Sequence, residues 1–250
     1  MKDKVVCFAP GSMLDVMPEL VSAFSKHSPV EIIYKLGPSG SLCEEILSGS
    51  QPDIFISANV AHPKKLFAAG IAGEPEIVIG NDMVALTNKH SSCQSSQLID
   101  FMRHKNTVIG ISTTGADPSG DYAAEILSRA DSMHGDMMLV NKAQMITGGR
   151  ETPNAPKGRN QYGWLMENGR ADIMLSYRSN ALAACNDNAD LTIIELPDEL
   201  SLRGLYAACV LSDAPMAAFD FVWYLLTNNA QSIFKQHGFA TKQILDSNCH

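Results

Sequence analysis

The sequence contains no run of about 18 apolar residues, the length that a membrane-spanning helix needs. Basic residues are also few. The 19 lysines and arginines leave a net charge of -8 at pH 7, and no basic cluster is longer than Lys64-Lys65. Because a nucleic-acid site needs a basic face, this composition argues against nucleic acid as a partner. A small anion is still compatible with it, since N–H and O–H dipoles hold an anion at contact distance whatever the net charge.

The motifs of common catalytic sites are missing as well. The chain has no P-loop and no G-x-G-x-x-G after a strand, and the turn Gly37-Pro38-Ser39-Gly40-Ser41 lacks the second glycine of a G-x-S-x-G nucleophile elbow. None of the seven histidines is expected in a turn that follows a strand, so no base is expected beside a serine. We therefore expect a protein that is not an enzyme.

Metal-ligand spacing is absent from the cysteines. No C-x-x-C pair occurs among the six cysteines, which are Cys7, Cys43, Cys93, Cys185, Cys209 and Cys249. Most are expected to be structural, and Cys7, Cys43 and Cys209 are expected to be small buried hydrophobic residues. Sequence alone does not pair them, so a disulfide stays open.

What the sequence does contain is an alternation of strands and helices. With 250 residues, of which 45% are hydrophobic, the chain can bury a proper core. Three apolar strand candidates each lead through a small-residue turn into a helical pattern: strands at 5–9, 32–36 and 53–57, and helices at 14–24, 39–47 and 63–69. Such an alternation predicts a parallel sheet whose strands end at one edge, so Ser12, Ser39 and the pair Ser57-Ala58 should converge there.

The turn at residues 37–41 is the clearest candidate for a binding element. Backbone N–H groups at the start of the helix that follows it lack partners within that helix, and Ser39 or Ser41 could add a hydroxyl group. Such a turn is a simple receptor for an anion. An ordinary explanation also exists for each serine in these turns, Ser12 included, because a serine that caps a helix contributes about 1 kcal/mol of stability without any ligand.

The alternation breaks near residue 80, where two strand candidates, Glu76–Ile79 and Met83–Thr87, follow each other without a helix between them. We interpret this break as a crossing into a second α/β unit. A return near residue 206 gives lobe 1 at residues 1–82 and 206–250 and lobe 2 at residues 83–205. Two crossings would form a hinge, and a cleft between the lobes would enclose a small ligand.

Further elements are predicted in the rest of the chain. Helices are predicted at 98–104, 122–130, 162–166, from 180 onward and at 215–237, and strands at 108–112, 137–143, 172–177, 191–196 and 205–211. Residues 147–160 are rich in Gly and Pro, which predicts an irregular loop. The helix at 215–237 carries residues at helical spacing that predict a stripe facing the core: Phe219, Val222, Trp223, Leu226, Ile233 and Phe234.

Several stretches resemble a known family. The sequences FAPGSM at 8–13, GPSGSL at 37–42, QPDIFISAN at 51–59, DPSGDYA at 117–123, YRSNA at 177–181 and IFKQHGF at 233–239 resemble the molybdate-binding proteins of ABC transporters. This similarity covers nearly the whole chain. It implies an α/β fold of the type II periplasmic binding protein class, with two lobes, a hinge of two crossing strands and a ligand cleft between the lobes. The loop that ends in Gly158-Arg159-Asn160-Gln161-Tyr162 looks like that of a less studied branch.

The resemblance assigns roles to individual residues. The family's two oxyanion-binding serines fall on Ser12 and Ser39, a backbone donor falls on Ser119, and a tyrosine hydroxyl falls on Tyr177. A further backbone donor falls on Arg159, where the family has a small apolar residue. Neighbours in the same turns complete the predicted ligand site: Gly11, Ala58, Gly120 and Asn160.

Alternatives stay open for some of these residues. Tyr177 could keep its hydroxyl in water, and Arg159 could pair with an acid instead of offering its guanidinium to an oxyanion or carboxylate. Asp117 resembles one of an acidic pair in archaeal relatives that hold molybdate or tungstate in expanded coordination. Ser176, however, stands where the second acid would be, and a carboxylate would repel an anion. Asp117 is equally compatible with a turn residue before Pro118.

The sequence and the resemblance together predict a monomeric substrate-binding protein of an ABC transporter. It would capture a small oxyanion, molybdate or tungstate, and deliver it to a membrane permease. No cofactor is implied, and molybdenum would enter only as an oxyanion, not as a bare cation. The expected location is the periplasm or cell surface, with an export signal removed ahead of Met1. Two alternatives are a receptor of the same fold for a sulfate-like or carboxylate anion, and a cytoplasmic effector-sensing module.

Overall fold

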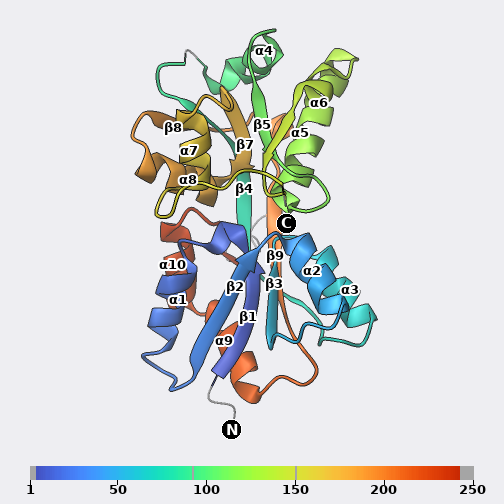
Figure 1. Cartoon of the computed structure of the whole chain (residues 1–250), viewed down its shortest axis with the longest axis vertical. Helices are drawn as coiled ribbons and strands as arrows, with labels where there is room; N and C mark the ends of the chain where they lie inside the picture. The colour runs from blue at the N-terminus through green and yellow to red at the C-terminus, as the bar shows by residue number, and fades with distance from the viewer. Residues whose placement is uncertain (1–3, 92, 150, 243–250) are drawn as a thin grey trace. The chain divides into compact units, whose positions relative to one another are not determined.

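The computed structural model describes residues 4–91, 93–149 and 151–242, and it divides the chain into two units (Figure 1). Unit 1 consists of Met1–Asn81 and Gly204–His250, and unit 2 consists of Asp82–Arg203. The chain passes from one unit to the other within strand β4 (Glu76–Asn88) and returns at the start of strand β9 (Arg203–Val210).

Unit 1 contains a parallel three-stranded core to which β9 adds an antiparallel strand. The parallel strands are β1 (Lys4–Pro10), β2 (Glu31–Gly37) and β3 (Ile54–Ser57). β1 pairs with β2 and with β3, and β9 pairs antiparallel with β3. Because Pro10 lies opposite Gly37, the carboxyl ends of β1 and β2 are level, and the turns that follow them start at the same edge.

The helices of unit 1 form two groups. The elements are a 3-10 helix at Gly11–Met13, α1 (Met17–Phe24), α2 (Ser39–Leu47), α3 (Ala61–Ala68), α9 (Met216–Leu225) and α10 (Asn228–Gln236). Leu42 of α2 and Leu66 of α3 pack with Phe55 of the sheet in one hydrophobic cluster. α1, α9 and α10 pack against one another, with the rings of Phe24 and Phe221 edge to face at 5.1 Å. Figure 1 shows α1 and α10 on the other side of the strands from α2 and α3.

Unit 2 has a mixed sheet. Its strands besides β4 are β5 (Ile109–Ser112), β6 (Gln144–Thr147), β7 (Ile173–Tyr177) and β8 (Leu191–Ile194). β5 pairs in parallel with β6 and β7, whereas β4 pairs antiparallel with β7 and β8. The carboxyl ends of β5, β6 and β7 therefore lie at one edge, as those of β1, β2 and β3 do in unit 1.

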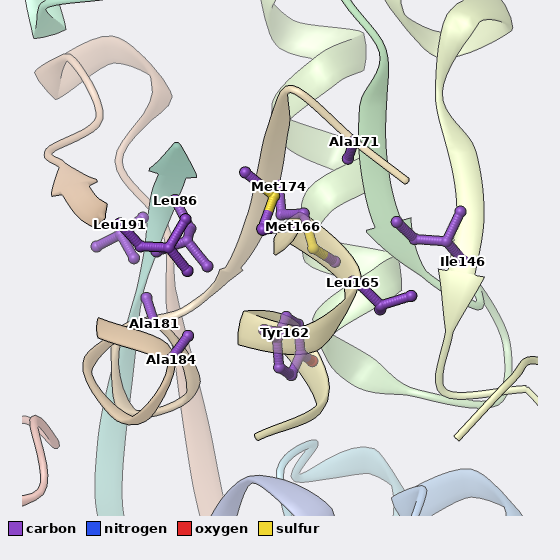
Figure 2. Close-up of a cluster of buried hydrophobic side chains, with 11 residues drawn as sticks. Leu86, Ile146, Tyr162, Leu165, Met166, Ala171, Met174, Ala181, Ala184 and Leu191 are labelled. Atoms are coloured by element: carbon purple, nitrogen blue, oxygen red, sulfur yellow. The ribbon is translucent and has the colours of Figure 1, made fainter. Parts of the chain in front are cut away.

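Helices cover the sheet of unit 2. They are α4 (Leu98–Arg103), α5 (Pro118–His134), α6 (Met138–Lys142), α7 (Gln161–Glu167) and α8 (Arg178–Asp187), with 3-10 helices at Ser95–Gln97 and Asp198–Leu200. α5 packs against β5 and β7. A hydrophobic cluster from the strands, α7 and α8 is drawn in Figure 2: Val84, Leu86, Ile146, Tyr162, Leu165, Met166, Ala171, Met174, Ala181, Ala184 and Leu191.

Two predicted strands are one continuous strand, β4. The separation into two strands at Gly80-Asn81-Asp82 is wrong, because these residues remain in the strand. Gly80 exchanges two backbone hydrogen bonds with Ala240, each of 2.8 Å, and the Asn81 side chain is fully buried. Tertiary contacts thus hold in strand conformation a tripeptide whose composition favours a turn.

The strand predicted at 137–143 is also wrong, since Met138–Lys142 form α6. The buried carboxylate of Asp131 accepts hydrogen bonds from the N–H groups of Leu139 and Val140, both at 2.9 Å. These two bonds satisfy donors in the first turn of a short helix. An acid on the preceding helix therefore selects helix over strand for a short apolar run.

The long helix predicted at 215–237 is two helices, α9 and α10. Thr227 separates them: its hydroxyl donates to the carbonyl of Tyr224 at 2.7 Å and accepts from the N–H of Ala230 at 3.4 Å, which caps α10. The prediction that the aromatic stripe faces the core is wrong for Phe219 and Trp223, which are 42% and 68% exposed. Phe221 and Tyr224 are buried in their place.

The five cysteines within the described residues are free thiols, and Cys249 lies outside the described residues. Burial raises the pKa of Cys7 and raises that of Cys209 to about 12. Both are therefore neutral, buried side chains, as predicted. Among the described residues, no helix has the length and apolarity to cross a membrane.

Candidate functional site

The turns after β1, β2 and β3 meet at one edge of unit 1. Gly11 and Ser12 lie in the 3-10 helix after β1, Ser39 is the first residue of α2, and Ala58 follows β3. The backbone N–H of Ala58 donates to Ser39 Oγ at 3.1 Å, which joins the second turn to the third. The convergence predicted for these two turns is therefore confirmed.

The Ser39 hydroxyl does not cap its own helix. The residue at the cap position of α2 is Pro38, and no side chain bonds to the first N–H groups there. Ser39 is fully buried, and its oxygen serves as the acceptor for Ala58. Capping therefore does not explain why a serine stands at this position. Because Ala58 N–H points at Ser39 Oγ, Ala58 supports the serine hydroxyl, whereas the sequence predicted Ala58 as a ligand residue.

Ser12 belongs to a chain of polar groups. Its hydroxyl lies 2.6 Å from the hydroxyl of Tyr206, and the side-chain amide of Asn81 donates to the same tyrosine oxygen at 3.1 Å. Tyr206 and Asn81 are fully buried, on β9 and β4. No side chain caps the 3-10 helix, so the expectation that Ser12 caps a helix is wrong. We call Ser12, Ser39, Ala58, Asn81 and Tyr206 the unit 1 donor set.

A histidine does lie beside a serine of this edge, contrary to the sequence expectation. Ser57 Oγ is 3.0 Å from His62 Nδ1 and donates to the carbonyl of Asn59 at 2.8 Å. A hydroxyl has one proton, so with that proton on the Asn59 carbonyl, His62 acts as the donor in this pair. Ser57 is also fully buried. The pair therefore fixes a turn and does not activate a nucleophile.

In unit 2, the turns after β5 and β6 meet in the same way. The N–H and the hydroxyl of Thr113 both donate to the carbonyl of Thr147, each at 2.9 Å. Ser112 donates through its hydroxyl to Asp117 Oδ2 at 2.6 Å. A Cβ atom on Gly148 would lie 2.1 Å from Ser112 Oγ, so only glycine allows the chain after β6 to pass over this pair.

Asp117 caps helix α5. Its Oδ1 accepts the backbone N–H of Ser119 at 3.1 Å. The N–H that the sequence predicted as an anion donor is therefore bonded to a carboxylate of the chain itself. Burial raises the pKa of Asp117 above its usual value, although the bonds from Ser112 and Ser119 oppose this shift. Of the two roles that the sequence left open for Asp117, the structure therefore supports that of the turn residue before Pro118.

Ser119 and Gly120 occupy different environments at the start of α5. The hydroxyl of Ser119 is buried and lies near the phenol of Tyr162. Gly120 packs so closely that a Cβ atom would lie 2.4 Å from the carbonyl oxygen of Ser112. The packing at Gly120 is a structural reason for glycine that needs no ligand.

The remaining predicted site residues lie just before α7 and at the end of β7. The guanidinium of Arg159 forms ion pairs with Glu167 and Asp187. The backbone N–H of Arg159 donates to the carbonyl of Pro156 at 3.1 Å. Of the two alternatives that the sequence left open for Arg159, the structure therefore shows pairing with acids. Asn160 caps α7 by accepting the N–H groups of residues 162 and 163 at 2.9 and 3.0 Å.

Tyr177 ends β7 and is 1% exposed, so its hydroxyl is not in bulk water. Its ring contacts that of Tyr122 edge to face at 6.2 Å. A role of Tyr177 in ligand binding stays a prediction.

Sequence reasoning missed four polar residues. Asn81 and Tyr206 lie inside apolar strands, where no sequence signal marks them. Tyr162 and Asn180 did lie in quoted motifs, the loop at 158–162 and YRSNA. The amide of Asn180 donates to the hydroxyl of Tyr162 at 3.0 Å and to Ser176 Oγ at 3.3 Å. We call Ser119, Tyr162, Ser176 and Asn180 the unit 2 donor set.

Both donor sets consist of neutral hydroxyl, amide and backbone groups. Within the part of the chain that the structure describes, no group of three or more His, Cys, Asp or Glu residues could hold a metal ion. Two cavities of unit 1 lie away from its donor set: one of about 420 Å³ beside Pro52 and Ser212, and one of about 450 Å³ beside Pro75 and Trp223. The chemistry that the two sets offer is hydrogen bonding to an acceptor-rich ligand.

The fold is the α/β fold of periplasmic binding proteins. It matches the sulfate-binding protein SubI of Mycobacterium tuberculosis with a TM-score of 0.79 at 15% identity, covering 97% of this chain and 89% of that protein. It also matches L-phospholactate-bound PEB3 of Campylobacter jejuni with a TM-score of 0.72 at 15% identity, covering 94% of this chain and 99% of that protein. These matches confirm the fold class predicted from the sequence.

The family can now be stated. Residues 5–240 match the family described as bacterial extracellular solute-binding protein, and the chain belongs to it. Among curated relatives, an uncharacterised protein of Pasteurella multocida is 27% identical over 85% of this chain and 89% of its own length. The molybdate-binding protein ModA of Haemophilus influenzae is 22% identical over 96% of this chain and 91% of its own length. The predicted resemblance is thereby confirmed, and so is the expectation that the protein is not an enzyme.

Proposed function

We propose that this solute-binding protein of an ABC transporter binds a small tetrahedral oxyanion, with molybdate or tungstate as the first candidates. The proposal rests on the unit 1 donor set and on the ModA relatives, which are named for molybdate. Delivery of the ion to a membrane permease follows from the transporter class and is part of the proposal.

The hydrogen bond from Ala58 to Ser39 is the observation that supports this proposal best. A serine oxygen that already accepts an N–H directs its own O–H elsewhere, as a donor. Ser39 also stands at the first turn of a nine-residue helix, where the helix dipole favours an anion. Each bond from such a donor to a charged ligand contributes about 1.5–3 kcal/mol.

Ser12 would donate in the same way. If the Asn81 amide donates to Tyr206 and Tyr206 donates to Ser12, the Ser12 proton is the next donor of the chain. Both serines are neutral, so they would hold a dianion through dipoles alone. A sulfate ion or a small phosphorylated carboxylic acid is the second candidate, because proteins of the same fold are described with sulfate and with L-phospholactate.

Calorimetric titration of the purified protein with molybdate, tungstate, sulfate, phosphate and a small carboxylate tests the proposal. We expect saturable binding of at least one oxyanion. Ser39→Ala should weaken that binding tenfold or more, about 1.4 kcal/mol. Ser41→Ala, two residues along the same helix, is the matched control and should retain the wild-type affinity.

The outcomes test separately the identity of the ligand, the role of Ser39 and oxyanion binding itself. Binding of sulfate without molybdate or tungstate would correct the ligand and leave the receptor class intact. Equal affinities of wild type and Ser39→Ala would remove Ser39 from the site. A wild-type protein that gives no heat with any of these anions would refute oxyanion binding itself.

A further inference from the structure

The loop that ends at Tyr162 is held at each of its last positions. Arg159 pairs with Glu167 and Asp187, and Asn160 caps α7. The side chain of Gln161 donates to the carbonyl of Pro153 at 2.9 Å and accepts the N–H of Ala155 at 2.7 Å. Three successive side chains thus fix the position from which α7 starts and at which the ring of Tyr162 enters unit 2.

The ring and the hydroxyl of Tyr162 have different surroundings. The ring belongs to the hydrophobic cluster of Figure 2 and is 8% exposed. Its oxygen accepts a hydrogen bond from the amide of Asn180 at 3.0 Å. Because Asn180 is the donor in that bond, the phenol keeps its own proton as a donor. The Tyr162 phenol is therefore similar to the Ser39 hydroxyl, whose oxygen accepts the N–H of Ala58. In both groups the oxygen accepts an N–H and the O–H is the donor.

The phenol lies near the start of α5. Burial raises the pKa of Tyr162 far above its usual value, and the negative charge of Asp117 raises it further. Hydrogen bonds with the side chains of Ser176, Asn180 and Ser119 oppose this rise. Tyr162 is therefore a neutral O–H donor at every physiological pH. The Ser119 hydroxyl is buried beside this phenol, so two hydroxyl groups of unit 2 lie close to one helix start.

We infer that Tyr162 is the hydroxyl of unit 2 that binds the oxyanion, and that Asn180 is the residue that positions it. This inference rests on the proposed function and goes beyond it, because the resemblance points to Tyr177 and Arg159 instead. The guanidinium of Arg159 is engaged by two acids, and the hydroxyl position of Tyr162 is fixed by a directional bond. The loop motif at 158–162 then has a function: it delivers a phenol to the binding groups.

Tyr162→Phe tests the inference, because it removes one oxygen atom and keeps the ring in the cluster. Its matched control is Tyr224→Phe in unit 1. Tyr224 is also 8% exposed and also has a buried hydroxyl, but it lies on α9 and not in a donor set. Calorimetry with molybdate, sulfate and phosphate, together with thermal unfolding, is applied to wild type, both variants and Tyr177→Phe.

We expect Tyr162→Phe to bind the best oxyanion of the wild type at least tenfold more weakly, while Tyr224→Phe binds it as the wild type does. Asn180→Ala should weaken binding in the wild-type background and have no further effect in the Tyr162→Phe background, since it acts through the phenol. A merely structural role would change the unfolding temperature without this dependence of one variant on the other.

Three results would overturn the inference. Tyr162→Phe could bind within twofold of wild type, or Tyr177→Phe could lose affinity while Tyr162→Phe keeps it. A wild type that binds none of the three ions would refute the proposed function together with the inference, whereas the first two results leave the proposed function intact. If Tyr162→Phe does not fold, Asn180→Ala decides: a tenfold loss supports the role of Tyr162, and an unchanged affinity overturns it.

Discussion

The hydroxyl groups of Ser12 and Tyr206 lie 2.6 Å apart although 194 residues separate them in the sequence. The amide of Asn81 donates to the same tyrosine oxygen, and either hydroxyl of the Ser12–Tyr206 pair can be the donor between them; we predict that Tyr206 donates to Ser12. A serine oriented in this way presents its own proton in one direction, and that orientation lowers the entropy that a ligand must remove on binding.

Tyr206→Phe should therefore weaken oxyanion binding about fivefold, or about 1 kcal/mol, without touching the ligand itself. It should also reduce the unfolding free energy by about 1–3 kcal/mol, because a buried amide loses one of its partners. Calorimetry and urea unfolding measure the two effects. Tyr34→Phe on β2 is the control, and an unchanged affinity in Tyr206→Phe would show that Ser12 does not depend on this chain.

Arg159→Ala should leave oxyanion affinity close to that of wild type. Its guanidinium pairs with Glu167 and Asp187 at a partly exposed position, so the loss of stability should also be small. Asp187→Asn provides the converse test, since it removes one of the two acids that engage the guanidinium. A large loss of affinity in Arg159→Ala, or tighter binding in Asp187→Asn, would contradict this prediction and make Arg159 a ligand residue.

Gly120→Ala should destabilise the protein whereas Gly11→Ala should not, although the sequence predicted both glycines at the ligand. An added Cβ at Gly120 would lie 2.4 Å from the carbonyl oxygen of Ser112, which belongs to the backbone and cannot move aside cheaply. We expect a loss of about 1–3 kcal/mol in unfolding free energy for Gly120→Ala. At Gly11 the Cβ would meet no atom within 4 Å, so stability should stay within about 0.5 kcal/mol.

Urea unfolding of both glycine variants checks these values. A stable Gly120→Ala variant would contradict the close packing of α5 on β5. For Gly11→Ala, calorimetry adds information, because the sequence predicts Gly11 at the ligand and the added Cβ should not disturb the fold. Normal stability with reduced affinity would place Gly11 at the ligand.

The sequence predicted well those features that depend on local pattern. Helix α2 spans Ser39–Leu47 as predicted, and the turns after β2 and β3 meet because parallel strands end at one edge. The errors arose where a distant residue decides the local structure. Gly80 pairs with Ala240, and Asp131 supplies the acceptors for the first turn of α6. No window of neighbouring residues contains that information.

The same distinction applies to the candidate site. Ser12 and Ser39 were predicted because they lie in strand-to-helix turns and because the family resemblance assigns its oxyanion-binding serines to these positions. Tyr206 was missed because it lies within an apolar strand, where its phenol is indistinguishable from a core aromatic residue until its partners are known. Tyr162 was quoted as part of a motif but had no role, since its partner Asn180 follows 18 residues later on another helix.

Asp117→Asn should make the stability of the protein less dependent on pH. The pKa of Asp117 is raised in the folded state, chiefly by burial and to a lesser extent by Asp121, so the folded protein binds this proton more tightly than the unfolded chain does. The unfolding free energy of wild type therefore decreases as pH rises from the usual aspartate pKa of 3.8 through the raised value, and is level above it.

Asparagine caps a helix as well as aspartate does and keeps an acceptor for the N–H of Ser119, but it carries no titrating proton. The stability of Asp117→Asn relative to wild type should consequently improve as the pH rises from the usual aspartate pKa of 3.8 through the raised value. Urea unfolding across this range measures the difference, with Asp213→Asn at an exposed turn as the control for the loss of one negative charge. A difference that stays constant with pH, or falls as pH rises, would show that the hydrogen bonds from Ser112 and Ser119 outweigh the burial of the carboxylate.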